Sequence, residues 1–181
     1  MSKTKKVILN SRQLNLTVKR LSFEIIENHI TNIDKCVIIG LQPRGVELAC
    51  EIHNILELNT GKKIKIGHLD TTFFRDDFRR RNGVILPNVT SIDFSIEDLN
   101  IVLVDDVLFT GRSVRSALDA LITFGRPNSV ELLVLIDRRF SRELPIQPQY
   151  IGRSVDVIDD EHVVVNLNEI NSNVILLNQK S

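Results

Sequence analysis

Apolar residues follow two different spacings along the chain, and the two spacings alternate. Leu14, Val18, Leu21 and Ile25 recur at helical spacing, and Ser11 before them is expected to cap a helix. Short continuous apolar runs are typical of buried strands. Such runs stand at CVIIG (36–40), IKIGHLD (64–70), IVLV (101–104), VELLVLI (130–136) and VVVNL (163–167). The pattern therefore predicts helices placed between strands.

Two further helices fill the gaps between these strands. One apolar stripe follows the first strand, at Val46, Ala49, Ile52 and Leu56. The other follows the run at 101–104 and comprises Val114, Ala117, Leu118, Leu121 and Ile122, ending at Gly125. Strands that alternate with helices predict an α/β fold, with a mostly parallel central sheet and helices on both faces. A length of 181 residues suits one domain, 1–181.

Residues 71–99 differ from the rest of the chain. This segment is charged at first and is then interrupted by Gly83 and Pro87. Segments of this kind are typical of surface excursions rather than of a core. We therefore expect a flexible β-arm here.

Charged or glycine-containing segments follow the predicted strands. They are 42–45, 70–77, 105–113 and 137–142. In open parallel sheets, ligands bind at the carboxyl ends of the strands. We therefore expect these four segments to surround one site.

The segment Ile101–Ser113, IVLVDDVLFTGRS, carries the most specific chemistry. Asp105 and Asp106 stand where the apolar strand surfaces, and such a pair suits two ribose hydroxyls or a shared Mg²⁺. The turn Val107–Ser113 opens a helix, so its backbone N–H groups and the helix dipole can hold a phosphate. Gly111 permits close approach of the ligand. A capped turn with solvated acids is the alternative, and without Gly-Lys-Ser/Thr the segment is not a nucleoside triphosphatase loop.

Net charge, the lengths of apolar runs and the cysteine content indicate which kinds of partner and compartment to expect. The formal net charge is zero, so RNA or phosphate binding would need a local basic patch. The N-terminal MSKTKKVILN has no apolar core, and no apolar run approaches about 20 residues, so we expect no membrane contact and a cytoplasmic location. Cys36 and Cys50 are expected to be buried thiols in a reducing compartment rather than zinc ligands.

The segment at 101–113 resembles the phosphoribosyl diphosphate (PRPP) signature of type I phosphoribosyltransferases, and nearly the whole chain resembles the PyrR family. The similar segments are VILN near the start, GLQPRGVELA (40–49), TFFRDD (72–77), VDDVLFTGRSVRSALDALITFGRP (104–127) and RELPIQPQYIGRSV (142–155). The resemblance implies a type I phosphoribosyltransferase fold with a flexible arm at about 71–99 and a small hood. The hood is expected from about 137–160 together with N-terminal residues.

The resemblance also implies an activity. Members are uracil phosphoribosyltransferases, which convert uracil and PRPP to UMP and diphosphate, and they regulate pyrimidine genes by binding the operon leader mRNA. Mg²⁺ is expected to be bound mainly through PRPP, which leaves the protein ligands open. A homodimer or a higher assembly of dimers is implied, although the sequence itself does not show the oligomeric state.

Carried over to this chain, the resemblance assigns four catalytic residues, Arg44, Arg75, Asp105 and Asp106. Arg75 has an alternative as an ion-pair partner of Asp76 or Asp77. The substrate-binding set is Pro43, Arg44, Gly45, Asp105, Asp106, Val107, Leu108, Phe109, Thr110, Gly111, Arg112 and Ser113. The base hood is assigned to Ile136, Asp137 and Arg138. Candidate RNA contacts are Lys19, Arg20, Arg139 and Arg142.

The chain departs from the family pattern at three places. Pro43 stands where threonine is common, and because this loop can hold a cis peptide, we expect one before Pro43. The segment Asp137–Pro145 is one residue longer and lacks a glycine, which puts the geometry near the base in doubt. Asn28 replaces an expected basic residue, which weakens the case for RNA binding.

Two alternatives to a uracil enzyme therefore stay open. The first is an RNA-binding regulator that senses UMP or UTP and has little turnover. The second is a phosphoribosyltransferase for another base, because the residues specify phosphoribosyl better than uracil.

Overall fold

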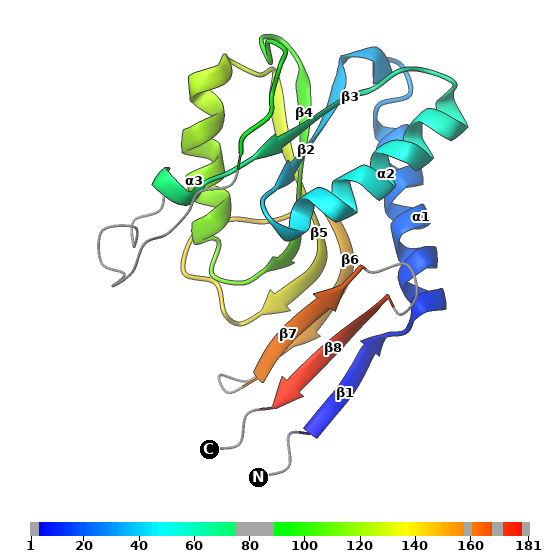
Figure 1. The fold of residues 1–181 in the computed structure, drawn as a ribbon, viewed down its shortest axis with the longest axis vertical. Helices are drawn as coiled ribbons and strands as arrows, with labels where there is room; N and C mark the ends of the chain where they lie inside the picture. The colour runs from blue at the N-terminus through cyan, green and yellow to red at the C-terminus, as the bar shows by residue number, and fades with distance from the viewer. Residues whose placement is uncertain (1–3, 75–88, 158–160, 168–171, 179–181) are drawn as a thin grey trace.

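A five-stranded parallel sheet forms the centre of the protein (Figure 1). The computed structural model describes residues 4–74, 89–157, 161–167 and 172–178. The strands lie in the order β3-β2-β4-β5-β6, and every neighbouring pair is parallel. Their bounds are β2 Cys36–Leu41, β3 Lys65–Leu69, β4 Asn100–Leu108, β5 Ser129–Arg139 and β6 Tyr150–Asp156. The predicted parallel sheet is confirmed.

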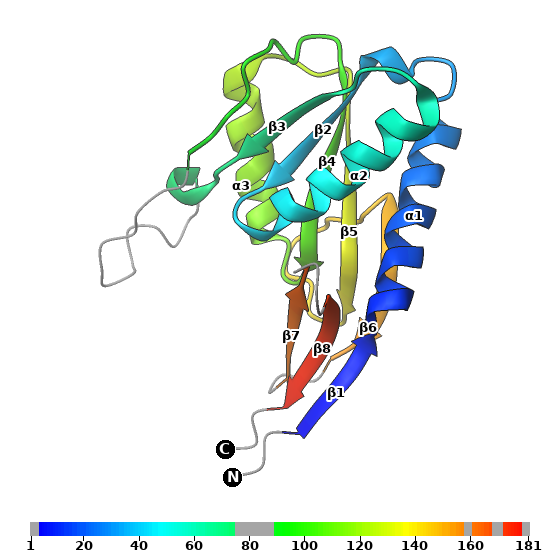
Figure 2. The ribbon, with the colours of Figure 1, turned by 45° about the vertical axis from the view of Figure 1, so that its right-hand side comes forward.

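Helices cover both faces of this sheet, as predicted. Helices α1 (Ser11–Asn28) and α2 (Arg44–Thr60) lie on one face and α3 (Arg112–Leu121) on the other (Figures 1 and 2). The alternation of side chains along a strand explains the arrangement. In β2, Ile38 packs in the core with α1 and α2, whereas Val37 and Ile39 pack in the core with α3. In the part of the chain that the structure describes, no helix is both long and apolar enough to span a membrane.

Two helix ends differ from the prediction. The α1 cap is Asn10, not Ser11: the Asn10 side chain accepts the Gln13 N–H at 2.9 Å, and Gln13 Oε1 accepts the Asn10 N–H at 3.1 Å. Helix α3 ends at Leu121 and continues as a 3₁₀ turn, Ile122–Phe124. Because of this change, Ile122 is 73% exposed and does not belong to the buried face.

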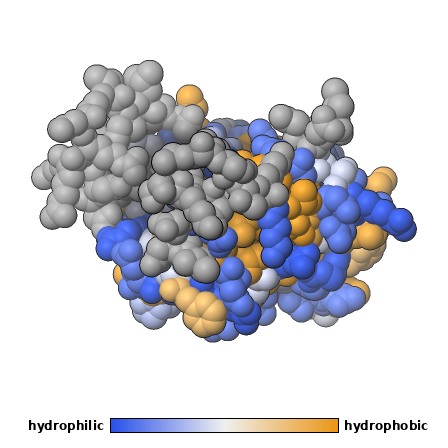
Figure 3. Space-filling model, turned by 90° about the horizontal axis from the view of Figure 1, so that it is seen from below, coloured by the Kyte–Doolittle hydropathy of each residue, from blue (hydrophilic) through white to orange (hydrophobic). Residues whose placement is uncertain are grey.

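A second, antiparallel sheet lies beyond the carboxyl ends of β4 and β5 (Figures 1 and 2). Its order is β1-β8-β7, and the strands are β1 Thr4–Leu9, β7 Glu161–Asn166 and β8 Asn173–Asn178. The run at 163–167 is therefore a strand, but it belongs to this small sheet. Seen from this end of the molecule, apolar side chains form a band between polar ones (Figure 3).

N-terminal residues pair in this small sheet with residues 173–178, which in turn pair with residues 161–166. Strand β6, which the hood was expected to include, pairs with β5 in the main sheet, Leu133 opposite Tyr150. Pairing of the two chain ends is a long-range contact, so no local pattern predicted it.

The C-terminal part of the predicted arm, from Ser91 onward, packs on the domain instead of extending from it. Ser91 pairs with His68 at the sheet edge, and Ile96 is fully buried in the core beside α3. The segment from Ser91 onward is therefore packed on the domain. Residues 75–88, about half of the predicted arm, lie outside the described residues.

Helix α2 approaches β4 at Gly45 more closely than a side chain allows. A Cβ built at Gly45 would lie 2.3 Å from the Val104 carbonyl oxygen and 3.1 Å from Asp105 Cα. The glycine therefore brings the first turn of α2 against the end of β4.

We expect Gly45→Ala to destabilise the protein, because the added methyl group would push α2 away from β4. Overpacking of this kind costs about 1–3 kcal/mol in the free energy of unfolding. Denaturant unfolding measures the change, with Asn54→Ala at an exposed position of the same helix as the control. Equal stability of the two variants would contradict the close approach.

Candidate active site

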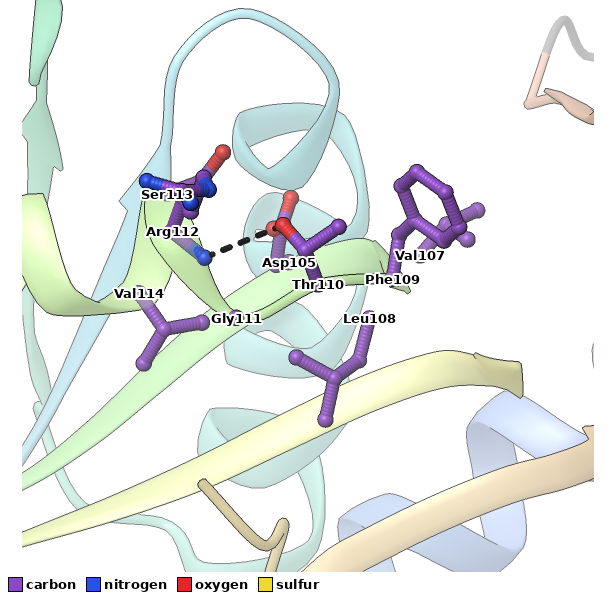
Figure 4. A pocket seen from close by; sticks show the side chains of 9 residues that line it. All are labelled: Asp105, Val107, Leu108, Phe109, Thr110, Gly111, Arg112, Ser113 and Val114. Atoms are coloured by element: carbon purple, nitrogen blue, oxygen red, sulfur yellow. Dashed lines mark hydrogen bonds between the residues drawn. The ribbon is translucent and has the colours of Figure 1, made fainter. Parts of the chain in front are cut away.

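Two adjoining cavities lie at the carboxyl ends of β2 and β4. One, of about 350 Å³, is lined by Asp105 and by the loop from Val107 to Val114 (Figure 4). The other, of about 320 Å³, is lined by Leu41–Arg44, Thr71, Asp105–Val107 and Ser113. The structure thus brings most of the predicted substrate-binding residues together. Arg75 lies outside the described residues.

Asp105 and Asp106 follow the apolar part of β4. Backbone N–H groups stabilise their charged forms, whereas burial and their mutual repulsion oppose them. The Asp105 carboxylate accepts the Asp106 N–H at 2.9 Å, and Asp106 Oδ1 accepts the Val107 N–H at 2.8 Å. Burial, and then the negative charge of Asp106, raise the pKa of Asp105 well above its ordinary value. Two adjacent acids here are therefore costly unless a ligand compensates them.

The second carboxylate oxygen of Asp106 lacks such a backbone donor among the described residues. Asp106 is 7% exposed, and among the described residues its buried Oδ2 accepts no hydrogen bond. Arg44 Nη1 lies 3.7 Å away, which is an ion pair rather than a hydrogen bond. Buried oxygens without donors are rare, so a hydroxyl or a cation from a ligand is expected to complete this site.

The loop Val107–Ser113 leads directly into α3. Gly111, at φ +91°, stands at the N-cap position, where the described residues provide no capping side chain. Thr110 Oγ1 accepts the Arg112 N–H at 3.4 Å (Figure 4). Backbone N–H groups and the positive end of the helix dipole therefore meet at this cavity, and this combination binds phosphate.

The other cavity begins with the loop between β2 and α2. The Gln42–Pro43 peptide is cis, as predicted. Arg44 is the first residue of α2, and 59% of its side chain is exposed, so its guanidinium is accessible to an anion. Thr71 is buried and lines the cavity, and Gln42 lines it as well. Residue patterns did not identify Thr71, although its place directly after β3 was a usable signal.

The predicted base segment lies in the last part of β5. Ile136, Asp137 and Arg138 are all buried, and none of them lines either of these two cavities. The Arg138 guanidinium lies over the Phe109 ring, 4.0 Å from its centroid. This segment therefore contacts the loop Val107–Ser113 through the Phe109 ring.

Three of the four candidate RNA contacts have partners inside the molecule. Arg20 Nη2 donates to the carbonyls of Ile151 and Gly152, both at 2.8 Å, and ties α1 to the edge strand β6. Arg139 pairs with Asp156 through two bonds of 2.7 and 2.9 Å. Arg142 contacts Asp137 and Phe109.

These pairings lower the number of cations available on the surface. A guanidinium that is already bonded to a carboxylate gains less from a phosphate than a free one. Lys19 remains as an exposed cation of the predicted set. Lys19 thus differs from the three arginines, each of which already bonds to another part of the molecule.

Comparison with known proteins agrees with this geometry. The family described as the phosphoribosyl transferase domain matches residues 5–169. Hypoxanthine phosphoribosyltransferase from Trypanosoma cruzi superimposes with a TM-score of 0.74 at 13% identity, covering 98% of this chain and 93% of that one. A hypoxanthine-guanine phosphoribosyltransferase from Bacillus anthracis has a TM-score of 0.67 at 17% identity, covering 88% and 86%. The fold and the site define a phosphoribosyltransferase of type I.

Relatives identified by sequence show to which family of phosphoribosyltransferases the chain is similar. "Bifunctional protein PyrR" from Desulfosudis oleivorans is 45% identical over 162 residues, which are 90% of this chain and 89% of that protein. The protein of the same name from Bacillus subtilis is 37% identical over 171 residues, covering 93% of each. The chain belongs to the PyrR family.

We expect Asp105→Asn to stabilise the protein at neutral pH. The pKa of Asp105 is higher in the folded state than in the unfolded state, so between these two pKa values the folded state binds more protons. The free energy of unfolding therefore falls as pH rises through that interval. Asparagine keeps an oxygen for the Asp106 N–H and removes the charge. The melting temperature at pH 7 should rise by about 2–4 °C for each kcal/mol recovered.

Thermal unfolding between pH 4 and 8 measures this effect. The advantage of Asp105→Asn should shrink toward the acid end, where protonation of the wild-type carboxyl in the folded state is matched increasingly by protonation in the unfolded state. Asp119→Asn, at a carboxylate on the surface of α3, is the matched control. A variant that melts at or below the wild-type temperature at pH 7 would contradict the proposed cost of Asp105.

Proposed function

We propose that this protein transfers the phosphoribosyl group of PRPP to uracil, giving UMP and diphosphate. The observation that carries the proposal is the meeting of Asp106, the loop Val107–Ser113 and Arg44 around two adjoining cavities. One cavity suits the 5′-phosphate and the other the diphosphate. The ribose would lie between them, beside Asp105, which lines both cavities, and Asp106, which lines the second.

The residues supply position and charge. Asp105 and Asp106 would accept hydrogen bonds from the neighbouring ribose hydroxyls, and the loop would hold the 5′-phosphate. As the uracil nitrogen bonds to C1 and the diphosphate oxygen leaves, negative charge grows on the leaving group. Arg44 faces this cavity and would stabilise that charge. Arg75 is proposed to join it from the arm, whose closure would exclude water.

Mg²⁺ is proposed to accompany PRPP. Among the described residues, no group of three or more His, Cys, Asp or Glu side chains is arranged to hold a metal. Mg²⁺, however, usually binds through one or two carboxylates together with substrate phosphates and water. Asp106, with its buried Oδ2 free of hydrogen bonds within the described part, fits that role. The ion would neutralise charge on the diphosphate.

RNA-dependent regulation of pyrimidine genes, with UMP or UTP as the signal, is the second part of the proposal. It is favoured by the relatives, which carry the name "Bifunctional protein PyrR". Because Arg20, Arg139 and Arg142 have internal partners, Lys19 is the proposed phosphate contact among the four. A single domain over 1–181, a dimer or assembly of dimers, and a cytoplasmic location complete the proposal. Free thiols at Cys36 and Cys50 agree with a reducing compartment.

Activity with PRPP, Mg²⁺ and each nucleobase tests the enzymatic part. We expect turnover with uracil in preference to hypoxanthine and guanine, and a loss of about 10²–10³-fold in kcat/KM for Asp106→Asn. Asp119→Asn on the outer face of α3 is the control and should keep wild-type activity. Near-wild-type turnover of Asp106→Asn would remove Asp106 from its role, and a preference for another base would replace uracil.

Gel-shift with the pyrimidine operon leader RNA, with and without UMP, tests the regulatory part. We expect UMP to strengthen binding, and Lys19→Ala to weaken it and to lower the salt dependence by about one phosphate contact. Arg139→Ala, whose wild-type side chain is paired with Asp156, serves as the comparison. Tight UMP-dependent RNA binding without turnover would favour a regulator over an enzyme, and no RNA binding would remove this part.

A further inference from the structure

The loop that we assign to the 5′-phosphate is supported from outside by the segment that follows β5. Thr110 O accepts the N–H groups of Glu143 at 3.0 Å and Leu144 at 3.2 Å. Glu143 Oε2 accepts from Arg112 Nε at 2.7 Å. A Cβ at Gly111 would lie 3.2 Å from Ile146 Cδ1, so the two segments are in close contact. The position of the loop therefore depends on this segment.

Arg142 makes the link that joins this support to the sheet. Its Nη1 donates to the Phe109 carbonyl at 2.6 Å, and its Nη2 pairs with Asp137 Oδ1. Only 24% of the Arg142 side chain and 12% of the Asp137 side chain are exposed. A planar guanidinium holds both acceptors in one fixed geometry, which the point charge of a lysine does not reproduce. The end of β5 and the backbone of the loop are thus fixed to each other.

The geometry of the peptide bond carries this constraint to the cavity. In a trans peptide unit the C=O and the next N–H point in opposite directions within one rigid plane. When Arg142 holds the Phe109 carbonyl, it also fixes the Thr110 N–H on the far side of that plane. The bonds to the Thr110 carbonyl orient the Gly111 N–H in the same way. Phe109, Thr110 and Gly111 all line the loop cavity (Figure 4).

We propose that Arg142 is a positioning residue for the 5′-phosphate: through the Phe109 carbonyl and Asp137 it orients the loop N–H groups that bind the phosphate. It acts through the loop and does not itself touch substrate. The proposal rests on the proposed function, because it takes the loop as the phosphate site. It gives Arg142 a role in support of the loop, whether or not Arg142 also contacts RNA.

Binding of UMP and of uridine to Arg142→Ala tests this role, since the two ligands differ only in the phosphate. We expect the Kd for UMP to rise about 10- to 100-fold, as for other supporting residues of a binding site. The Kd for uridine should stay unchanged. Titration calorimetry suits UMP, and an NMR titration suits the weaker uridine. In steady-state assays, KM for PRPP should rise by a larger factor than kcat falls.

Arg139→Ala is the matched control. Arg139 lies three residues away and also pairs with a carboxylate, Asp156, but it contacts no residue of the loop through those bonds. Its replacement should leave UMP binding unchanged. Arg142→Lys keeps the charge but not the two-acceptor geometry, so its UMP affinity should lie between wild type and Arg142→Ala. If Arg142→Ala does not fold, the UMP affinity of Arg142→Lys is measured in its place.

Three results would overturn the proposal: unchanged UMP affinity in folded Arg142 variants, an equal loss for UMP and uridine, or the same loss in Arg139→Ala. Failure of the proposed function gives a different result. In that case the wild-type protein itself shows neither UMP binding nor turnover of uracil with PRPP.

Discussion

Two carboxylates stand at the end of β4, and the strand that carries them is hydrogen-bonded on both sides. β2 and β5 pair with β4, and residues 101–104 are fully buried between the two helical layers. The strand therefore holds Asp105 at the edge of both cavities and keeps Asp106 buried beside it. Burial and mutual repulsion raise the pKa of Asp105. The rest of the site is arranged around this fixed and unfavourable pair, as is common where binding energy compensates a strained site.

The two loops beside the carboxylates are held by different means. Gly45 lets α2 begin against the backbone of β4, which brings Arg44 within 3.7 Å of Asp106. The phosphate loop is supported by the segment after β5 through backbone bonds and Arg142. The close approach at Gly45 and the bonds from Arg142 both fix backbone atoms. A backbone N–H group keeps one direction only when its peptide plane is fixed. Rigid support around an exposed ligand cavity is the usual condition for tight, specific binding.

Three arginines of the described residues connect separate elements of the fold. Arg20 joins α1 to β6, Arg153 Nη1 donates to the Ile8 carbonyl and so joins β6 to the small sheet, and Arg142 joins β5 to the phosphate loop. Carbonyl groups at the ends and edges of sheets lack strand partners, and guanidinium groups satisfy them. These three arginines therefore link separate elements of the described structure.

Local patterns in the sequence determined the sheet, the helices and the strand-end loops, because apolar periodicity and chain order depend on neighbouring residues. They also identified Asp105, Asp106, the loop at 107–113 and the peptide before Pro43. Only the tertiary structure decided that the chain ends pair in a separate sheet and that Arg142 bonds to Phe109 and Asp137. These features depend on contacts between residues far apart in sequence, and a single sequence contains no local signal for which distant acceptor an arginine will meet.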